Sequence, residues 1–354
     1  MKYFKRYNKT DILLLTHLRK YETKLGECVL CGLDNLSVEE NISQTKAAYV
    51  LVGIPEDIGV KANLGKGGSD SCWFPFLDAF LNIQSNDFLS GENVFIAGHF
   101  DFTEIKNLIK INASDDEEKV AAYRHAVNTI DDEVEELINI ITRCNKIPII
   151  IGGGHNNAYP ALKGAAKGLL KAGLTQLAQI NCINLDAHAN YQPLEGRHSG
   201  NAFRYADEDG YLNKYCIVGL HENNLQQNVW IDMVNNPFVD CITYEDIFLH
   251  EKRNFIQAVA HATSFTEDNY TGIELDLDSI ENVLTSASTP CGITTLHARQ
   301  FVNFVSTDSR IAYLHFCEGA TILETGEICN SAGKLISYLV SDFIKAHSYK
   351  KEPR

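Results

Sequence analysis

Eight short apolar runs divide this chain, and their spacing constrains its fold more than any other feature. The runs are AYVLVGI (48–54), NVFIAG (93–98), IPIIIGG (147–153), QINCINLD (179–186), YCIVGL (215–220), VDCIT (239–243), GIELDLD (272–278) and RIAYLHF (310–316). Most have apolar residues in succession and are rich in β-formers, which is typical of strands buried on both faces. The segments between them have helical patterns. This alternation predicts a parallel α/β sheet of about eight strands, with right-handed crossovers and helices on both faces.

The clearest helical segment covers residues 119–145. Its apolar residues recur every three or four positions, with acidic residues on the opposite face. They are Val120, Tyr123, Val127, Ile130, Val134, Leu137 and Ile141. The chain has 354 residues, 45% of them apolar, which is enough for one large core. We therefore expect one α/β domain over residues 47–354, preceded by a polar, partly helical extension over residues 1–46.

The composition argues against several classes of partner. The net charge is −15, whereas nucleic-acid binding requires an excess of lysine and arginine. No apolar run approaches the roughly 18 residues that a membrane span needs. The basic N-terminus lacks the cleavage site of a signal peptide, and the ten cysteines lie mostly among apolar neighbours, as reduced thiols do. We expect a cytoplasmic protein whose partners are neither nucleic acid nor a membrane.

Three of the predicted strands end in side chains that can bind a metal ion. These ends carry His155 after three glycines, then Asp186, His188 and Asn190 at alternate positions, and then Asp276 and Asp278. Residues two apart on an extended chain point to the same side, and ligands of open α/β sheets bind beyond the carboxyl ends of the strands. Each motif alone is equally compatible with a tight loop or a helix cap. Three such ends in one chain favour a shared site.

The chemistry of these side chains indicates a cation site. Carboxylates that meet in a buried crevice repel one another, so they must take up protons or bind cations. A mixture of carboxylate and imidazole ligands suits Mn²⁺ or Mg²⁺, and Zn²⁺ or Fe²⁺ also fit. Five or six ligands favour two ions over one, and a pair of ions about 3.5–4 Å apart can activate water for hydrolysis.

The order of these motifs resembles the ureohydrolase family, which comprises arginases, agmatinases and formimidoylglutamases. The matching segments are GGGH (152–155), DAHAN (186–190), SGN (199–201), DLD (276–278) and the late glutamate Glu318. Together they cover roughly residues 47–346. The resemblance implies an arginase-like catalytic domain with a single parallel α/β sheet and a binuclear manganese site.

The resemblance also implies how the metal ions would be held. Metal A would be bound by His155, Asp186, Asn190 and Asp276, and metal B by Asp186, His188, Asp276 and Asp278. The family normally has aspartate in place of Asn190. An amide offers a carbonyl oxygen but no charge, so we expect metal A to be bound more weakly. Glu318 would hold the cationic amidinium end of the substrate, while Asp186 and Asp276 would bridge the two ions at the catalytic centre.

The choice of substrate is predicted from the loop over residues 191–206. In the family, polar residues of this loop contact the α-carboxylate of the substrate, and Gln192, Ser199 and Asn201 occupy such places here. The loop also carries Arg197, His198 and Arg204. This positive cluster beside an acidic site indicates a substrate with carboxylates. The competing interpretation is a surface arginine paired with Glu195 or Asp207.

Two further positions of the resemblance disfavour arginine as the substrate. Phe203 stands where arginases have a histidine that shuttles protons. Asn224 stands where they have an aspartate that pairs with the α-ammonium group. N-formimino-L-glutamate has two carboxylates and no free α-ammonium group, and therefore fits better. Lys61 and Asn63, in the loop after the first predicted strand, are expected near the mouth of the site, although a plain surface loop is equally compatible.

The leading hypothesis is a manganese-dependent formimidoylglutamase. It would hydrolyse N-formimino-L-glutamate to L-glutamate and formamide, which is a step of histidine breakdown. One alternative is another ureohydrolase acting on a different guanidine or amidine. A second is a catalytically silent homologue in which Asn190 has cost one metal ion. A deacetylase-like enzyme with one metal is less favoured, because its tyrosine and paired histidines are not recognisable. The resemblance also implies a homo-oligomer.

Overall fold

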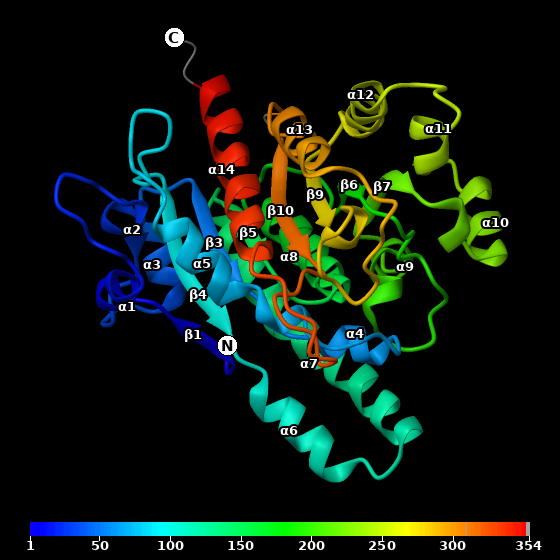
Figure 1. The fold of residues 1–354 in the computed structure, drawn as a ribbon, viewed down its shortest axis with the longest axis horizontal. Helices are drawn as coiled ribbons and strands as arrows, with labels where there is room; N and C mark the ends of the chain where they lie inside the picture. Colours follow the sequence, from blue (N-terminus) through cyan, green and yellow to red (C-terminus); the bar gives the residue numbers. More distant parts are fainter. Residues whose placement is uncertain (309, 352–354) are drawn as a thin grey trace.

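A computed structural model, which describes residues 1–308 and 310–351, places one central sheet between two layers of helices (Figure 1). The strand order is β1-β4-β3-β5-β10-β9-β6-β7-β8, and β2 also pairs with β4. The strands are β1 Phe4–Arg6, β2 Leu30–Cys31, β3 Tyr49–Gly53, β4 Val94–Phe100, β5 Ile147–Ile151, β6 Ile180–Leu185, β7 Leu212–Leu220, β8 Val239–Thr243, β9 Thr271–Asp276 and β10 Ile311–Cys317. Each of the eight apolar runs forms one of the strands β3 to β10, which pair in parallel. The predicted parallel α/β sheet is therefore confirmed.

The sheet has ten strands in the described chain, so the prediction of about eight was too low. The two additional strands are β1 and β2, which have three and two residues. Both pair with β4, β1 in antiparallel and β2 in parallel orientation. Strands this short have no periodic pattern that a sequence could reveal, because recognisable strands need four to eight residues.

The first 46 residues also contribute to the core. Ile12 and Leu25 are fully buried among the apolar residues that cover one face of the sheet. The hydroxyl of Tyr7 accepts a hydrogen bond from Trp73 Nε1 at 3.1 Å. This segment therefore closes the β4 edge of the sheet with its own strands and side chains.

Helices cover both faces of the sheet. One layer consists of α1 (Lys9–Leu14), α2 (Leu25–Cys28), α5 (Trp73–Leu81), α11 (Tyr244–Phe248), α12 (Phe255–Thr266), α13 (Thr295–Val305) and α14 (Ala332–Lys351). The other consists of α3 (Val38–Gln44), α4 (Ile58–Ala62), α6 (Thr103–Asn112), α7 (Asp116–Arg143), α8 (Ala158–Lys171), α9 (Ala202–Glu208) and α10 (Gln227–Asn235). The helix predicted over 119–145 corresponds to α7. In the described part of the chain, no helix has the length and apolar character of a membrane span.

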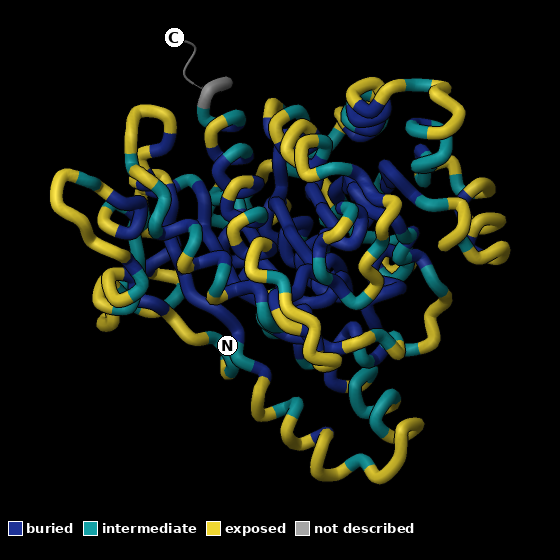
Figure 2. The backbone as a smooth tube through the Cα atoms, viewed as in Figure 1, coloured by how far each residue is buried: buried dark blue, intermediate teal, exposed yellow. Residues whose placement is uncertain are grey.

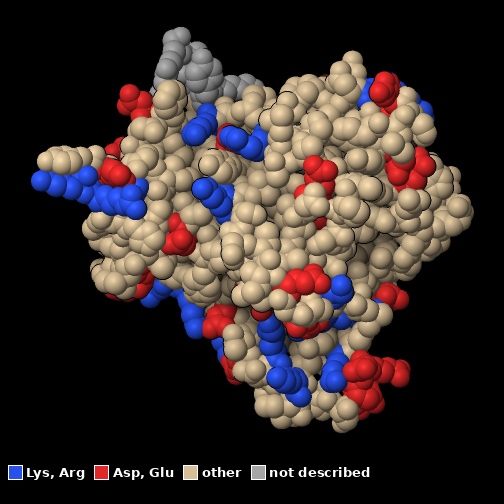
Figure 3. All heavy atoms as spheres, viewed as in Figure 1, with Lys and Arg blue, Asp and Glu red and all other residues tan. Residues whose placement is uncertain are grey.

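The central strands, such as β3, are buried on both faces, as their unbroken apolar runs predict (Figure 2). In β3, Tyr49 and Leu51 pack into the core on one side of the sheet, whereas Val50 and Val52 pack on the other. Successive side chains of a strand point to opposite faces, so an apolar run without alternation supplies both cores at once. On the surface, acidic and basic side chains are interspersed over the face shown in Figure 3.

The register of the sheet brings four strand ends to one place. Ile151, Phe316, Leu275 and Leu185 lie in one row across the neighbouring strands β5, β10, β9 and β6. The residues that follow them in the chain therefore leave the same edge of the sheet. This edge is where open α/β sheets bind their ligands.

Candidate metal centre

The loop after β5 carries His155 on a backbone that requires glycine. Gly153 has a φ of +79°, and a Cβ atom at this position would lie 2.7 Å from the carbonyl oxygen of Ile54. The buried carboxylate of Glu56 accepts a hydrogen bond from the backbone N–H of Gly154 at 3.0 Å. Together the glycines and Glu56 turn the chain sharply and fix the direction in which His155 projects.

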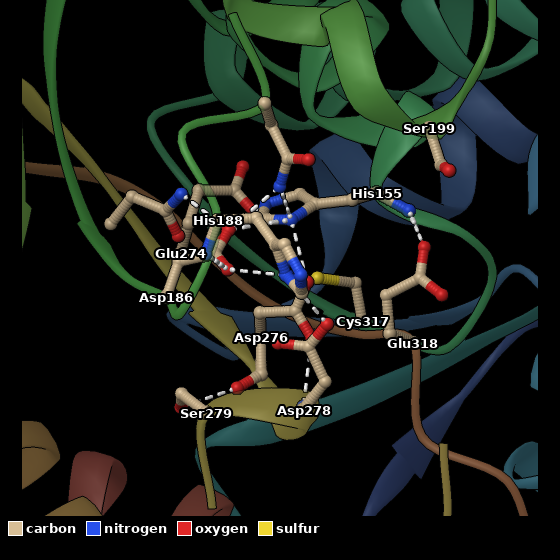
Figure 4. Close-up of polar contacts among 12 residues, drawn as sticks. His155, Asp186, His188, Ser199, Glu274, Asp276, Asp278, Ser279, Cys317 and Glu318 are labelled. Carbon is tan, nitrogen blue, oxygen red and sulfur yellow. Dashed lines mark hydrogen bonds and ion pairs between the residues drawn. The ribbon is translucent and has the colours of Figure 1, made fainter. Parts of the chain in front are cut away.

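The inner part of the cluster, which we call position A, consists of His155, Asp186, Asp276 and Asn190. Nδ1 of His155 lies 2.9 Å from Oδ2 of Asp276 and 3.2 Å from Oδ2 of Asp186 (Figure 4). The first three of these residues are buried. Nδ2 of Asn190 lies 2.7 Å from both His155 Nδ1 and Asp186 Oδ2. The four side chains predicted for metal A therefore converge on one point.

The outer part of the cluster, position B, consists of His188, Asp186, Asp278 and the adjacent Asp276. Nδ1 of His188 lies 3.0 Å from Oδ2 of Asp278 and 3.7 Å from Oδ1 of Asp186. The side chain of His188 is 33% exposed, in contrast to the buried ligands of position A. Oδ1 of Asp278 is buried and has no hydrogen-bond partner among the described residues. All six predicted ligands thus meet at one edge of the sheet.

The electrostatics of the cluster call for additional positive charge. Burial, together with the neighbouring Asp278 and Asp186, raises the pKa of Asp276 well above its ordinary value. The Asp278 carboxylate raises the pKa of His188 to about 12. Burial would also raise the pKa of Asp186, but hydrogen bonds from His155 and His188 outweigh it and lower that pKa. A divalent cation would satisfy carboxylates that otherwise depend on protons and imidazolium groups.

A second buried carboxylate supports His155 from behind. Oε2 of Glu274 lies 3.5 Å from His155 Nε2, and 2.7 Å from Nδ1 of His315. Its Oε1 accepts a hydrogen bond from the Tyr313 hydroxyl at 2.7 Å. Although burial opposes it, the charges and hydrogen bonds of His315 and His155 lower the pKa of Glu274 to about 2. The Glu274 carboxylate therefore lies on the Nε2 side of the imidazole, whose Nδ1 faces the cluster.

A cavity of about 200 Å³ opens beside position B. It is lined by Asn63, Gly65, His188, Ala189, Asn190, Tyr191, Gln192, Ser199, Asn224, Leu225, Gln226, Val229, Asp276, Asp278, Ser286, Ala287 and Glu318. The Glu318 carboxylate accepts hydrogen bonds from the backbone N–H of His155 at 2.8 Å and from Ser286 Oγ at 3.4 Å. Burial raises the pKa of Glu318 to about 7. The cavity therefore joins the outer half of the cluster to the glutamate predicted to hold an amidinium group.

Three of the predicted substrate contacts reach this cavity. Gln192, Ser199 and Asn224 line its wall, and so does Asn63, whose Nδ2 donates to Ser199 Oγ at 3.5 Å. Asn201 does not line the cavity. Its Oδ1 accepts a hydrogen bond from the backbone N–H of His198, and its Nδ2 donates one to the Gly196 carbonyl at 2.8 Å. The Asn201 side chain therefore stabilises the conformation of this loop.

The structure does not place Arg197, which was predicted to bind a substrate carboxylate, on the wall of the cavity. Arg197 is only 3% exposed and pairs with Asp131 of α7 through Nε at 2.9 Å. Its remaining N–H groups bond Asn201 Oδ1 at 3.0 Å and the Asn156 carbonyl at 2.8 Å. Its guanidinium also lies 4.6 Å from the ring centre of Tyr159. The arginine therefore ties the substrate loop to α7 and to the residue after His155.

The other cations that the sequence placed near the substrate also have structural partners. Arg204 contacts Asp232 and Glu208 at 3.1 Å each. Lys61 pairs with Asp57 and Glu324 at 3.2 Å each. His198 is buried, and its Nδ1 accepts a hydrogen bond from the backbone N–H of Gly200. None of these described side chains lines the cavity.

Phe203 packs beneath the centre. It is fully buried, its ring stacks on Tyr215 at 4.3 Å, and its edge contacts the His155 ring at 5.3 Å. Its place in the fold is therefore that of a packing residue under position A.

Gln226 and Ser286 are polar residues of the cavity wall that are not anticipated from the sequence. Gln226 precedes α10, and Ser286 lies in the segment between Asp278 and α13. Neither lies in a motif or a periodic segment. Their only signal was a polar side chain in a loop after a predicted strand.

Comparison with known proteins identifies relatives of this arrangement. A model of the arginase family matches residues 48–341. A formimidoylglutamase of Streptococcus pyogenes is 25% identical over 161 residues, which is 44% of this chain and 48% of that protein. The matched segment thus spans about half the length of this curated relative.

Solved structures share the fold over almost the whole chain. A formiminoglutamase of Trypanosoma cruzi with Mn²⁺ has a TM-score of 0.68 and 18% identity, and the match covers 94% of this chain and 100% of that one. A formimidoylglutamase of Bacillus subtilis has a TM-score of 0.70 and 16% identity, covering 96% of this chain and 95% of that one. At these identities the likeness is one of fold.

Proposed function

The chain belongs to the arginase family, and from this premise we propose that it is a metal-dependent hydrolase of linear amidines. Its proposed substrate is N-formimino-L-glutamate, which it would convert to L-glutamate and formamide. One observation carries this proposal. A single cavity exposes His188, Asp276 and Asp278 of the metal centre together with the carboxylate of Glu318. The curated relative from Streptococcus pyogenes, a formimidoylglutamase, supports the choice of substrate.

Position B fits a divalent cation by the chemistry of its donors. Two aspartates and an imidazole surround it, and the buried Oδ1 of Asp278 lacks a hydrogen-bond partner among the described residues. We propose Mn²⁺, the ion in the similar structure from Trypanosoma cruzi, although oxygen and imidazole donors also accept other divalent metals. When bound, the cation would supply a Lewis acid that polarises water and substrate.

Glu318 is suited to bind the amidinium end of the substrate. An amidinium is planar and cationic, and its N–H groups can donate two charge-assisted hydrogen bonds to one carboxylate. The backbone N–H of His155 and the hydroxyl of Ser286 hold the Glu318 carboxylate at the cavity wall. Burial raises the pKa of Glu318 to about 7. A bound amidinium would lower this pKa again, because its positive charge favours the ionised carboxylate.

Neutral polar groups would bind the two carboxylates of the substrate. Among the described residues, the cavity wall contains no lysine or arginine. It presents amide and hydroxyl donors instead, from Asn63, Gln192, Ser199, Asn224 and Gln226. Amide and hydroxyl groups donate hydrogen bonds to carboxylate oxygens, and they do so without the desolvation cost of a buried lysine or arginine.

Hydrolysis would proceed by addition of water to the amidine carbon. A C–O bond forms, the C–N bond to the glutamate nitrogen breaks, and this nitrogen takes a proton as it leaves. Phe203 cannot deliver that proton and lies outside the cavity wall. We therefore assign the proton to water in the cavity, while Glu318 keeps the remaining formamide nitrogen in place.

We also propose that the protein acts in the cytoplasm, in histidine breakdown, as a homo-oligomer. The ten cysteines are free, which is usual in a reducing compartment. Leu108 and Ile111 on α6 are 52% and 77% exposed and offer apolar surface for contact between subunits. Light scattering on the purified protein would measure the oligomeric state.

A substrate panel tests the proposed function. Mn²⁺-loaded protein is given N-formimino-L-glutamate, arginine, agmatine or 4-guanidinobutyrate, and release of formamide or urea is measured. We expect formamide from N-formimino-L-glutamate and little urea from the other three. Urea release from one of the guanidines instead would make the chain a different ureohydrolase.

Glu318→Gln is the matched control for this test. It keeps the shape of the side chain and removes the charge that would pair with the amidinium. We expect kcat/KM to fall about 100-fold or more, since a charge-assisted contact is lost, while bound metal stays unchanged because Glu318 is not a proposed ligand. Unchanged turnover in this variant would remove Glu318 from the site.

A further inference from the structure

We infer that the centre binds one divalent cation, at position B, and that the side-chain amide of Asn190 occupies position A in place of a second. This inference rests on the proposed metal-dependent function of the same site. It concerns the number of ions, however, and stands whichever amidine is the substrate.

The orientation of the Asn190 amide is set by its neighbours. Oδ2 of Asp186 can only accept hydrogen bonds when ionised, and Asn190 Nδ2 lies 2.7 Å from it. The same nitrogen lies 2.7 Å from Nδ1 of His155. The amide therefore presents N–H groups to two atoms that would otherwise ligate metal A. A metal ion at position A would need the Asn190 Oδ1 atom as a ligand, with a free lone pair directed at the ion. In this orientation of the amide, Oδ1 points away from position A.

One carboxylate oxygen of position A already has hydrogen-bond donors within the protein. Oδ2 of Asp186 accepts hydrogen bonds from Asn184 Nδ2 at 2.9 Å and from Asn190 Nδ2. A cation bound at position A would break these buried hydrogen bonds to Asp186 Oδ2. Its binding free energy would therefore have to compensate for the loss.

Position B also has internal contacts, since Oδ2 of Asp278 lies 3.0 Å from His188 Nδ1, but it differs in one carboxylate oxygen. Oδ1 of Asp278 is buried without a hydrogen-bond partner among the described residues, so a cation would gain a ligand there. His188 and Asp278 line the cavity, from which an ion can enter. Of position A, Asn190 and Asp276 line it too, whereas His155 is not part of its wall. We therefore assign the bound ion to position B, which contains the unpartnered oxygen of Asp278.

The charge balance favours one ion as well. The three carboxylates of the two positions are those of Asp186, Asp276 and Asp278. The neutral amide of Asn190 adds no negative charge, so a cation at position A is attracted less strongly than one at position B, which the Asp278 carboxylate faces. Aspartate in place of Asn190 would supply the missing negative charge and a second oxygen ligand.

The test is to count bound manganese in wild type, Asn190→Asp and Asn224→Asp. Both variants exchange an amide for a carboxylate on the wall of the same cavity, but only residue 190 belongs to position A. The φ of Asn190 is +46°, a conformation that aspartate also tolerates, so the exchange leaves the backbone undisturbed. Each protein is loaded with MnCl₂, desalted, and measured by mass spectrometry and low-temperature electron paramagnetic resonance.

We expect about one manganese per chain in wild type and in Asn224→Asp, with the six-line spectrum of an isolated Mn²⁺ ion. Asn190→Asp should hold about two, with the broadened spectrum of a coupled pair. Two tightly held ions in wild type, no ion in wild type, or a single ion in folded Asn190→Asp would each overturn the inference. Formamide release separates this result from the proposed function. Two bound ions together with formamide release would contradict only the inference about the number of ions. One bound ion without turnover of any amidine would contradict only the proposed function.

Discussion

Single side chains determine what the centre can hold. Asn190 and Glu318 both have positive φ angles, +46° and +61°, which only glycine adopts without cost. Such backbone strain amounts to about 1–3 kcal/mol per residue and persists where the surrounding structure imposes it. Both residues line the same cavity. We interpret the strain as the cost of turning an amide and a carboxylate toward the ligand site.

Arg197 illustrates a residue whose role depends on burial. Its guanidinium is paired with the buried Asp131, so removing the arginine leaves an uncompensated carboxylate in the core. Burial already raises the pKa of Asp131 despite the arginine. We predict that Arg197→Met lowers the free energy of unfolding by about 3–5 kcal/mol, measured by urea denaturation.

The double variant Arg197→Met, Asp131→Leu separates charge from packing. It removes both members of the pair, so a large part of the lost stability should return. Equal destabilisation of the double and the single variant would show that the contacts of Arg197 to Asn201 and Asn156, rather than its charge, carry its role.

At this scale the sequence was most informative where residues follow a strand end. Positions after predicted strand ends, together with the family resemblance, indicate six metal ligands that lie together in the structure: His155, Asp186, His188, Asn190, Asp276 and Asp278. The positive residues of the substrate loop were less predictable. Asp131, the partner of Arg197, is 66 positions away in the chain. Local sequence patterns cannot predict an ion pair between residues so far apart in the chain.

At the scale of elements, the register of four parallel strands positions the site. Ile151, Phe316, Leu275 and Leu185 form one row, so the loops after β5, β10, β9 and β6 emerge together. These strands could be predicted because each is a long apolar run. Their order across the sheet could not, since β9 and β10 enter between β5 and β6 although they come last in the chain.

The predicted N-terminal extension contains two strands that the sequence does not reveal. Strands β1 and β2 pair with β4, and Tyr7 bonds to the buried Trp73. We predict that deleting residues 1–46 lowers the thermal unfolding midpoint and the yield of soluble protein, because it uncovers the edge of β4 and apolar core surface. Circular dichroism during heating would measure the midpoint. An unchanged midpoint would show that the segment is a dispensable extension.

At the scale of the whole molecule, a single sheet brings together residues that lie far apart in sequence. The proposed metal ligands and Glu318 come from positions between 155 and 318, all at or shortly after the carboxyl ends of β5, β6, β9 and β10. The fold class was accessible from the sequence because buried strands and amphipathic helices have distinct periodicities. The shape of the cavity was not, since it depends on loops such as the segment that carries Ser286.

The central claim is that this strand edge forms a cation-dependent hydrolytic site for a linear amidine. The most direct test is formamide release from N-formimino-L-glutamate as Mn²⁺ is titrated into metal-free protein. We predict no release without metal and a rise to a plateau with added Mn²⁺, with no such rise in Asp276→Ala, which removes a central ligand. Equal release without metal, or none from protein shown to hold manganese, would contradict the account.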